Sequence, residues 1–178
     1  MFYYIHGYKS SPESNKGLIF KKKLGAVAIK YRDCEPENIV ISDCLKRISD
    51  IIKNDKNVVL IGSSLGGYLA VETALIHPNV KKLILLNPAI VPPSTNLDNH
   101  KDMPRRILEE IRDKRLFKNR MNTKIIIFRG TEDDLIPDDW ITKFAKVHEA
   151  TVIFLHDDHR FSRNLTKLPI IISNLSKK

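Results

Sequence analysis

The stretch Val58-Val59-Leu60-Ile61-Gly62-Ser63-Ser64-Leu65-Gly66-Gly67 decides the fold of this chain. It starts with four apolar residues and continues as the pattern Gly-x-Ser-x-Gly, in which Ser64 is the central serine. A segment with helical spacing, Leu65 to His77, follows at once. The sequence therefore predicts that Ser64 stands at a turn between a buried strand and a helix, with its hydroxyl group lifted away from the sheet.

Glycine at both ends of this pattern has a steric reason. The residues two before and two after the serine approach each other closely in such a turn, so we expect Gly62 and Gly66 to be needed there. The helix N-terminus adds partial positive charge where an oxyanion would form. Two other interpretations stay open, a glycine-rich turn without chemistry and a phosphate-binding turn. The phosphate-binding turn is disfavoured because Tyr68 stands where a lysine would follow the glycines.

Short apolar runs recur along the chain and predict the strands of one sheet. They do not alternate with polar residues, which is typical of strands buried on both faces of a parallel sheet. The runs are Phe2 to Ile5, Ala26 to Ile29, Val58 to Ile61, Leu83 to Leu86, Ile125 to Phe128 and Val152 to Leu155.

Segments with helical periodicity lie between several of these runs. One is expected over Ser42 to Lys53 with Ser42 as its N-cap, and another is expected to be capped by Asp138 or Asp139. A last amphipathic helix is expected around 165–175. Strand and helix alternate, so the sequence predicts the α/β class, with a doubly wound, mostly parallel sheet of about six strands and helices on both faces.

The length of 178 residues is that of one domain, and 42% of the residues are apolar, which suffices for a core. We interpret 1–178 as a single domain. The connection 87–123 is much longer than is usual in this class. It predicts a small cap-like insert over the carboxyl edge of the sheet, with a charged helical stretch around Met103 to Phe117.

The formal net charge of +9 is compatible with an anionic partner or with a solvated, lysine-rich surface. From His100 to Lys124 there are nine basic and four acidic residues, giving 9 − 4 = +5. If this segment overhangs Ser64 it would attract an anionic leaving group, although a solvated face is the favoured interpretation. Only Phe117 is aromatic among these basic residues, so we expect no nucleic acid partner.

Composition also argues against several other classes. Cys34 and Cys44 are expected to be free thiols in a reducing compartment, and no metal-binding spacing of Cys or His is present. No apolar run approaches the ~20 residues that cross a bilayer. The chain enters an apolar stretch at Phe2, so no targeting segment is expected. These features predict a cytoplasmic protein without a membrane partner, and they leave its oligomeric state open.

The order of these elements resembles the α/β-hydrolase superfamily, and in particular small bacterial esterases of the YqiA-like type. The resemblance extends over nearly the whole chain, with the first two strands of the full fold missing. It implies a nucleophile, an acid and a histidine in that order, with Ser64 as the nucleophile.

The acid is implied by the segment Gly130 to Pro137, which resembles the Gly-x-x-Asp-x-x-Val/Ile-Pro pattern of that superfamily. This resemblance selects Asp133, whose carboxylate would hold the imidazole in the productive tautomer. The neighbouring Glu132 and Asp134 are expected to cap a helix or to face solvent.

The base is implied by the loop after the last strand, where His159-Arg160-Phe161 resembles a His-x-Phe ending. His156 is expected to be a partly buried structural residue instead. Related proteins usually have glycines before the histidine, whereas this chain has Asp157 and Asp158. Their carboxylates could raise the pKa of the histidine or simply face water.

The resemblance also implies an oxyanion hole made of two backbone amides. One amide is that of Leu65, which follows the nucleophile. The other is that of Tyr8, in the loop His6-Gly7-Tyr8 after the first strand, where Gly7 is expected to permit a close approach.

Together these features predict a serine hydrolase of small to medium carboxylic esters or thioesters that acts through an acyl-enzyme without a metal or organic cofactor. Activity should rise with pH as His159 loses its proton. The short insert is expected to give little hydrophobic cover, which argues against a large lipid substrate. One alternative is a catalytically inactive, hydrolase-like protein whose basic insert contacts polyanions, and another is a lyase or perhydrolysis reaction of the same triad.

Overall fold

The computed structural model of the protein describes residues 1–100 and 102–176. Within them a six-stranded sheet, all of whose strands are parallel, forms in the order β2-β1-β3-β4-β5-β6. The prediction of about six parallel strands is therefore confirmed. The strands are β1 (Phe2–Ile5), β2 (Val27–Ile29), β3 (Val58–Ser63), β4 (Val80–Leu86), β5 (Lys124–Gly130) and β6 (Thr151–Leu155).

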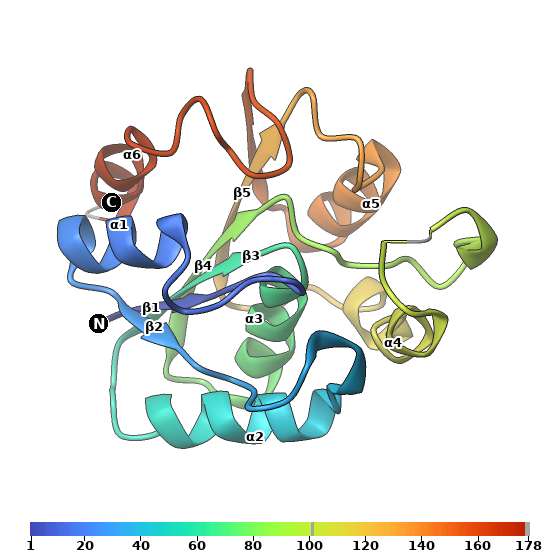
Figure 1. Ribbon diagram of the computed structural model, residues 1–178, viewed down its shortest axis with the longest axis horizontal. Helices are drawn as coiled ribbons and strands as arrows, with labels where there is room; N and C mark the ends of the chain where they lie inside the picture. The colour runs from blue at the N-terminus through green and yellow to red at the C-terminus, as the bar shows by residue number, and fades with distance from the viewer. Residues whose placement is uncertain (101, 177–178) are drawn as a thin grey trace.

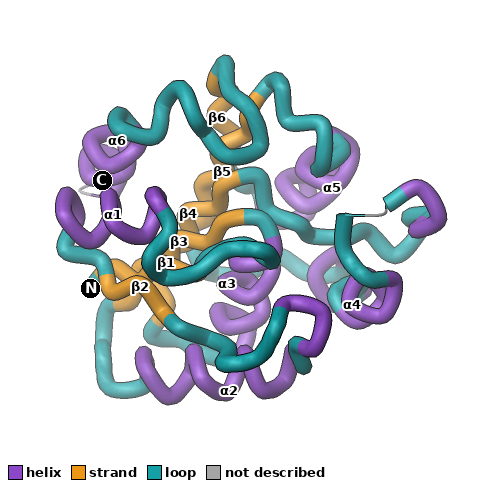
Figure 2. The backbone as a smooth tube through the Cα atoms, viewed as in Figure 1, coloured by secondary structure: helices purple, strands orange, loops and turns teal. Residues whose placement is uncertain are grey.

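Helices cover both faces of this sheet, as Figures 1 and 2 show. On one face α1 and α6 lie side by side, and the opposite face carries α2, α3 and α5 (Figure 1). The helices are α1 (Asn15–Leu24), α2 (Ile41–Ile52), α3 (Leu65–Ile76), α4 (Arg105–Glu110), α5 (Asp138–His148) and α6 (Leu168–Ser176). Short 3-10 turns lie at Pro36–Asn38, Leu97–Asn99 and Lys114–Phe117.

Two hydrophobic clusters, one on each face of the sheet, explain why the strands have unbroken runs of apolar residues. Along β1, Tyr3 and Ile5 pack into the cluster under α2, α3 and α5, whereas Tyr4 packs against Phe20 of α1. Successive side chains of a strand point to opposite faces, so a strand that is covered on both sides needs apolar residues at every position.

The strand order places a crevice where a ligand can enter. The chain moves outward from β1 to β2, and then returns to place β3 on the other side of β1. Loops that leave β1 and β3 therefore diverge at the carboxyl edge of the sheet, which is the usual ligand site of open α/β sheets. Because Ile5 pairs with Gly62, the residues after both strands start from the same level of the sheet.

Helix boundaries differ from the sequence prediction in three places. Helix α2 begins at Ile41 with Val40 as its N-cap, so Ser42 lies inside the first turn and does not cap it. Helix α5 has Pro137 as its N-cap, and the two aspartates that were expected to cap it lie in its first turn instead. There their negative charge still interacts favourably with the helix dipole. The last helix begins at Leu168, three residues later than expected.

Helix α1 was not predicted from the sequence. Only Gly17 and Phe20 are buried along it, so its apolar stripe is too short to produce a clear helical period. The local signal is instead its cap, because the Ser14 hydroxyl accepts a hydrogen bond from the backbone nitrogen of Gly17.

The connection 87–123 lies against α2, α3 and α5. Glu110 accepts a hydrogen bond from the first amide of α2 at 3.2 Å, and Arg115 forms an ion pair with the buried Glu72 of α3 at 2.8 Å. The buried His148 of α5 accepts from the amide of Met121 and contacts the carbonyl oxygen of Leu116. The expected helical stretch appears as α4 followed by a 3-10 turn.

Candidate active site

Ser64 occupies a strained turn between β3 and α3. Its φ of 53° and ψ of −120° lie outside the regions that a residue with a side chain normally adopts. The turn is held by hydrogen bonds at both ends of the residue. Its nitrogen donates to Leu86, and its carbonyl oxygen accepts from Gly67 and Ala89. The backbone thus fixes the direction in which the hydroxyl group leaves the sheet.

Steric contact explains the glycines on either side. A Cβ atom at Gly66 would lie 2.1 Å from the carbonyl oxygen of Ile5, and one at Gly62 would lie 2.4 Å from that of Gly66. Gly7 is less constrained, because a Cβ there would be 3.4 Å from the Cβ of Ser64, an ordinary contact. A close approach therefore requires glycine at the two positions of the turn, and does not strictly require it at Gly7.

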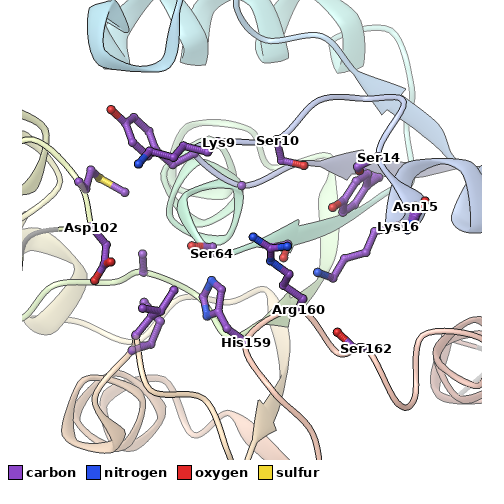
Figure 3. Close-up of a pocket in the computed structure, with 18 of the residues that line it drawn as sticks. Lys9, Ser10, Ser14, Asn15, Lys16, Ser64, Asp102, His159, Arg160 and Ser162 are labelled. Carbon is purple, nitrogen blue, oxygen red and sulfur yellow. The ribbon is translucent and has the colours of Figure 1, made fainter.

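His159 and Asp133 form a hydrogen-bonded pair at the carboxyl edge of the sheet. The Nδ1 atom of His159 lies 3.0 Å from Oδ2 of Asp133, whose side chain is fully buried. A carboxylate only accepts hydrogen bonds, so the pairing assigns the proton to Nδ1 and leaves Nε2 as a free acceptor. Figure 3 shows the imidazole directed toward Ser64 across the cleft.

Two backbone amides also hold the Asp133 carboxylate. Its Oδ1 atom accepts from the amides of Leu135 and Ile136 at 2.9 and 3.2 Å. Burial alone would raise the pKa of Asp133, but the hydrogen bonds from His159 and from these two amides outweigh it and hold the pKa below the ordinary value. Asp133 is therefore a stable anion and a permanent acceptor for the histidine.

Arg129 is a positioning residue that the sequence did not reveal. Its guanidinium is buried next to Asp133, with Nη1 at 2.9 Å from Oδ2, and it donates from Nη2 to the carbonyl oxygen of Asp133. Its Nε atom donates to Asp138 at the start of α5. One guanidinium therefore links β5, α5 and the loop between them, which carries Asp133.

Two backbone amides stand beside Ser64 without a hydrogen-bond acceptor in the described part of the chain, those of Leu65 and Tyr8. The loop that carries Tyr8 is clamped from the end of β2. Tyr31 donates to the carbonyl oxygen of Gly7, and Arg32 donates to that of Tyr8. Such fixed, free amides are what an oxyanion requires.

His6, next to this loop, is held in the neutral form. It is buried, stacks on Tyr31 with ring centroids 4.3 Å apart, and contacts the carbonyl oxygen of Gly7 through Nδ1. Burial lowers the pKa of His6 to about 4. His6 therefore supports the loop and carries no charge at neutral pH.

A cleft of about 690 Å³ opens over these groups. Ser64, His159, Gly7 and Tyr8 line it, so the serine turn, the histidine and the loop after β1 share one solvent-accessible space. Figure 3 places Ser64 and His159 at its centre. Its size is that of a pocket for a small molecule.

The family model described as "Uncharacterised protein family (UPF0227)" matches residues 1–175. The chain belongs to UPF0227. No curated protein matches it. Solved α/β-hydrolase structures resemble this UPF0227 chain in fold, at sequence identities below 25%.

Three of these structures cover nearly all of the UPF0227 chain. Est1E from Butyrivibrio proteoclasticus with ferulic acid bound has a TM-score of 0.78 and 16% identity, over 98% of this chain and 87% of that one. The alpha/beta hydrolase domain-containing protein 10 from mouse has a TM-score of 0.72 and 18% identity, over 99% and 89%. A lipase-esterase related protein from Clostridium acetobutylicum ATCC 824 has a TM-score of 0.72 and 16% identity, over 97% and 93%. The likeness establishes the α/β-hydrolase fold.

The loop that carries His159 in the UPF0227 chain is built around the two aspartates that replace the expected glycines. Both carboxylates are engaged by the loop itself, and neither forms an ion pair with the imidazole. Asp157 is fully buried and accepts from the amides of Asp158, Arg163 and Asn164. Asp158 accepts from the amide of Arg160 and from the amide and hydroxyl of Ser162. The two carboxylates therefore shape the loop.

Asn87 was also missed from the sequence, although it links the loops of the site. It follows β4 with a φ of 42° and is fully buried. Its side-chain oxygen accepts from the amide of Gly130, and its nitrogen donates to the carbonyl oxygens of Asp158 and His159. The sequence offered only an asparagine directly after an apolar run, a residue type that tolerates the left-handed region, and this does not reveal the hydrogen bonds.

The residues near Asp133 and His159 in the sequence differ in part from expectation. His156 was expected to be partly buried, but its side chain is 74% exposed and contacts Glu132 and Arg163, so that prediction was wrong. It lies at the outer end of β6, where the edge strand leaves one side open. Glu132 forms an ion pair with Arg163, and Asp134 is exposed to solvent.

None of the described lysines and arginines of the connection 87–123 lines the cleft. Arg105 pairs with Asp98 and Glu109, Arg106 with Glu110, and Arg115 with Asp113 and Glu72. Lys101 lies outside the described residues. From the described part of this connection the cleft receives Ala89, His100, Asp102, Met103 and Leu108. Three of these five residues, Ala89, Met103 and Leu108, are apolar.

Neither cysteine forms a disulfide bond, with Cys44 buried and Cys34 exposed. In residues 1–100 and 102–176 no cluster of three or more metal-binding side chains occurs. Over the same residues, no helix has both the length and the apolar character to span a membrane.

Proposed function

We propose that this UPF0227 protein is a serine hydrolase of small to medium carboxylic esters or thioesters, with Ser64, His159 and Asp133 as its triad. The observation that carries the proposal is the pairing of His159 with the buried anion Asp133 at the edge of the cleft that Ser64 enters from a strained turn. A fold alone needs none of these three groups in that relation.

In the proposed cycle, Nε2 of His159 removes the proton of the Ser64 hydroxyl while its oxygen attacks the carbonyl carbon of the ester. The oxyanion that forms accepts hydrogen bonds from the amides of Leu65 and Tyr8. His159 then donates its proton to the leaving oxygen or sulfur, and Asp133 stabilises the charged imidazole in between. Water hydrolyses the acyl-enzyme with the same histidine as its base.

The proposal needs no metal or organic cofactor, since serine, imidazole and two amides supply every step. It agrees with the descriptions of two structures that have a similar fold. Est1E was solved with ferulic acid bound, and the Clostridium acetobutylicum protein is described as lipase-esterase related. Because the identities are near 16%, these structures support an ester-like substrate only as a class.

The experiment is labelling with a fluorophosphonate, which reacts with activated serines, combined with hydrolysis of 4-nitrophenyl esters of increasing acyl length. Wild-type protein should be labelled at Ser64 and should turn over the shorter esters. Ser64→Ala should lose both the label and the turnover.

Ser63→Ala is the matched control, because it removes the adjacent hydroxyl of the same motif and should keep the label on Ser64. Full turnover in Ser64→Ala, or a label that remains after that substitution, would overturn the proposed mechanism. Activity should also rise with pH, because the base acts in its neutral form.

A further inference from the structure

The cleft beside Ser64 has two chemically different walls. One wall, from the connection 87–123, the loop after β5 and α5, is lined by the apolar residues Ala89, Met103, Leu108, Leu135, Ile136 and Trp140. The other, from the start of α1 and the loops after β1 and β6, is lined by Ser10, Asn15, Lys16, Arg160 and Ser162. In Figure 3, Lys16 and Arg160 lie on one side of Ser64, and Asp102 lies on the other. Lys9, the third cation of the lining, lies on the side of Asp102, with its Nζ atom 6.0 Å from the centroid of the Tyr8 ring. Two of the three cations therefore gather on one side of the serine.

Lys16 carries a half-buried ammonium group on the polar wall. It is the second residue of α1, and the chain brings its Nζ atom toward Arg160 and the cleft (Figure 3). Among the described residues no carboxylate lies within 4 Å of this atom and no acceptor bonds to it. Burial lowers the pKa of Lys16 to about 8, so the group is still mostly charged at neutral pH.

The acidic residues nearest to Lys16 are committed to other partners. Asp158 bonds to the amides of its own loop and to the Ser162 hydroxyl, and Asp157 bonds to the amides that follow it. Asp133 bonds to His159 and to two amides of the loop between β5 and α5. These carboxylates stabilise the charge of Lys16 from a distance, but their oxygens leave its donors unpaired.

Arg160 adds a second free cation. Its backbone amide is fixed by Asp158 at 2.9 Å, while its guanidinium forms no ion pair with a described residue. Figure 3 shows the guanidinium between Ser64 and the ammonium of Lys16. The N-terminus of α1, which has no acidic residue in its first turn, adds partial positive charge at the same wall. Two unpaired cations that converge in a cleft are suited to bind one anionic group.

We propose that Lys16 and Arg160 form an anion subsite, and that the substrate is an ester or thioester bearing a carboxylate or phosphate group on one half and an apolar group on the other. The apolar half lies against Met103, Leu108 and Trp140. This inference rests on the proposed function, because it assigns the substrate class of the same site. The connection 87–123 is not needed as a source of positive charge, since four of its five arginines pair with carboxylates and none of the five lines the cleft.

The test compares charged esters with neutral partners of similar shape. 4-Butyryloxybenzoate and its methyl ester release phenols that carry a carboxylate or a neutral methyl ester at the same position, and 4-butyryloxyphenyl phosphate replaces the carboxylate by a phosphate. Monophenyl adipate and phenyl methyl adipate place the same difference in the acyl half. We expect kcat/KM to be roughly 10- to 100-fold higher for the charged member of at least one pair, the usual range for a hydrogen bond to a charged group. The comparison also shows which of the two anions the subsite prefers.

Lys16→Gln and Arg160→Gln should each lower the ratio of charged to neutral kcat/KM, and the double variant should bring it close to one. Lys21→Gln is the matched control, because Lys21 is an exposed lysine of the same helix outside the cleft and should leave the ratio unchanged. In wild type the ratio should also fall between pH 7 and 9 as Lys16 loses its proton, while Arg160 stays charged. Equal kcat/KM within every pair, or a ratio that survives in the double variant, would overturn the inference.

A binding experiment separates this inference from the proposed function. Calorimetry with Ser64→Ala, 4-butyryloxybenzoate and its methyl ester measures the subsite without turnover. The charged ester should bind at least tenfold more tightly. Lys16→Gln added to Ser64→Ala should reduce that difference, and Lys16→Gln together with Arg160→Gln should remove it. If wild type hydrolyses no ester while this difference is found, the proposed function fails and the anion subsite stands. If esters are hydrolysed and no difference is found in binding or in rate, the subsite fails alone.

Discussion

A single methyl group added at Gly66 should disable the site through the geometry of the sheet. In Gly66→Ala the new Cβ would lie 2.1 Å from the carbonyl oxygen of Ile5 and 2.5 Å from that of His6. Real Cβ atoms stay at least 3.0 Å away, so the start of α3 and the end of β1 must separate by about 0.9 Å, which is 3.0 − 2.1. Both obstacles are backbone atoms, and no side-chain rotation can relieve the contact.

The atoms that must separate are those that hold the two free amides. Leu65 belongs to the displaced end of α3, and Tyr8 follows the displaced end of β1. A misplacement of about 1 Å can lower a rate by ~100-fold, so we expect kcat/KM of Gly66→Ala to fall by roughly that factor. Overpacking of this kind costs ~1–3 kcal/mol of stability, and each kcal/mol lowers Tm by ~2–4 °C in a chain of this size.

Ester hydrolysis and thermal unfolding of three alanine variants check this reasoning. Gly25→Ala is the matched control, because Gly25 has a φ of 64° with no atom near its Cβ position. Its free energy of unfolding should fall by ~1–2 kcal/mol, because alanine disfavours the left-handed backbone conformation, and its activity should not change. In Gly7→Ala the new Cβ would lie 3.4 Å from the carbonyl oxygen of Ser63 and from the Cβ of Ser64, so kcat/KM should fall less than tenfold. If Gly66→Ala retained kcat/KM within threefold of Gly25→Ala, the steric argument for the turn would be refuted.

Three other substitutions have defined outcomes. Asp133→Asn should lower kcat by up to ~10⁴-fold by favouring the wrong tautomer of the histidine. Because the pKa of Asp133 is below its ordinary value of 3.8, its stabilising effect is complete above that value, so the gap in Tm between wild type and Asp133→Asn should stay constant from pH 8 to 5 and shrink in stronger acid. Asn87→Ala should lower Tm and reduce kcat/KM by about tenfold or more, since it frees the loops of both triad partners, and unchanged kinetics would exclude a positioning role. Burial raises the pKa of Glu72 from 4.5 to about 7, so the contribution of Glu72 to the stability of wild type should fall as pH rises through that range. Calorimetry should therefore find that the stability of Glu72→Gln increases relative to that of wild type between pH 5 and 8. A constant difference between the two would contradict the assigned role of burial.

Much of the fold could be predicted because its signals are local. Every strand of the described sheet overlaps one of the six apolar runs, since the middle of a strand that is covered on both faces is packed with apolar residues. Several strands extend beyond their runs, and buried polar residues such as Lys82 and Arg129 lie there. The serine turn was also visible locally, because the crowding between Gly62 and Gly66 leaves only glycine at both positions. Helix α1 escaped detection because its apolar stripe is two residues long, and the caps of α2 and α5 were misplaced because several candidate residues lie together.

The site could be predicted only as far as chain order carries information. The resemblance named Asp133 and His159, and the structure brings Nδ1 and Oδ2 of this pair to 3.0 Å. Arg129 and Asn87 were invisible because their roles depend on hydrogen bonds across the sheet, with partners 4 to 72 residues away. The two aspartates before His159 looked like possible modifiers of its pKa, and they serve the loop instead.

By itself the sequence determined the α/β class, the parallel strands and the position of the serine turn, because burial on two faces and steric crowding constrain neighbouring residues directly. Only the tertiary structure decided which charges face the cleft. The basic cluster at 100–124 was one possible source of positive charge, with a solvated face as the favoured interpretation, and four of its five arginines pair with carboxylates. Lys16 and Arg160 line the cleft instead, from opposite ends of the chain. The physical reason is that charge acts through space, so its effect at a site depends on partners that sequence order does not reveal.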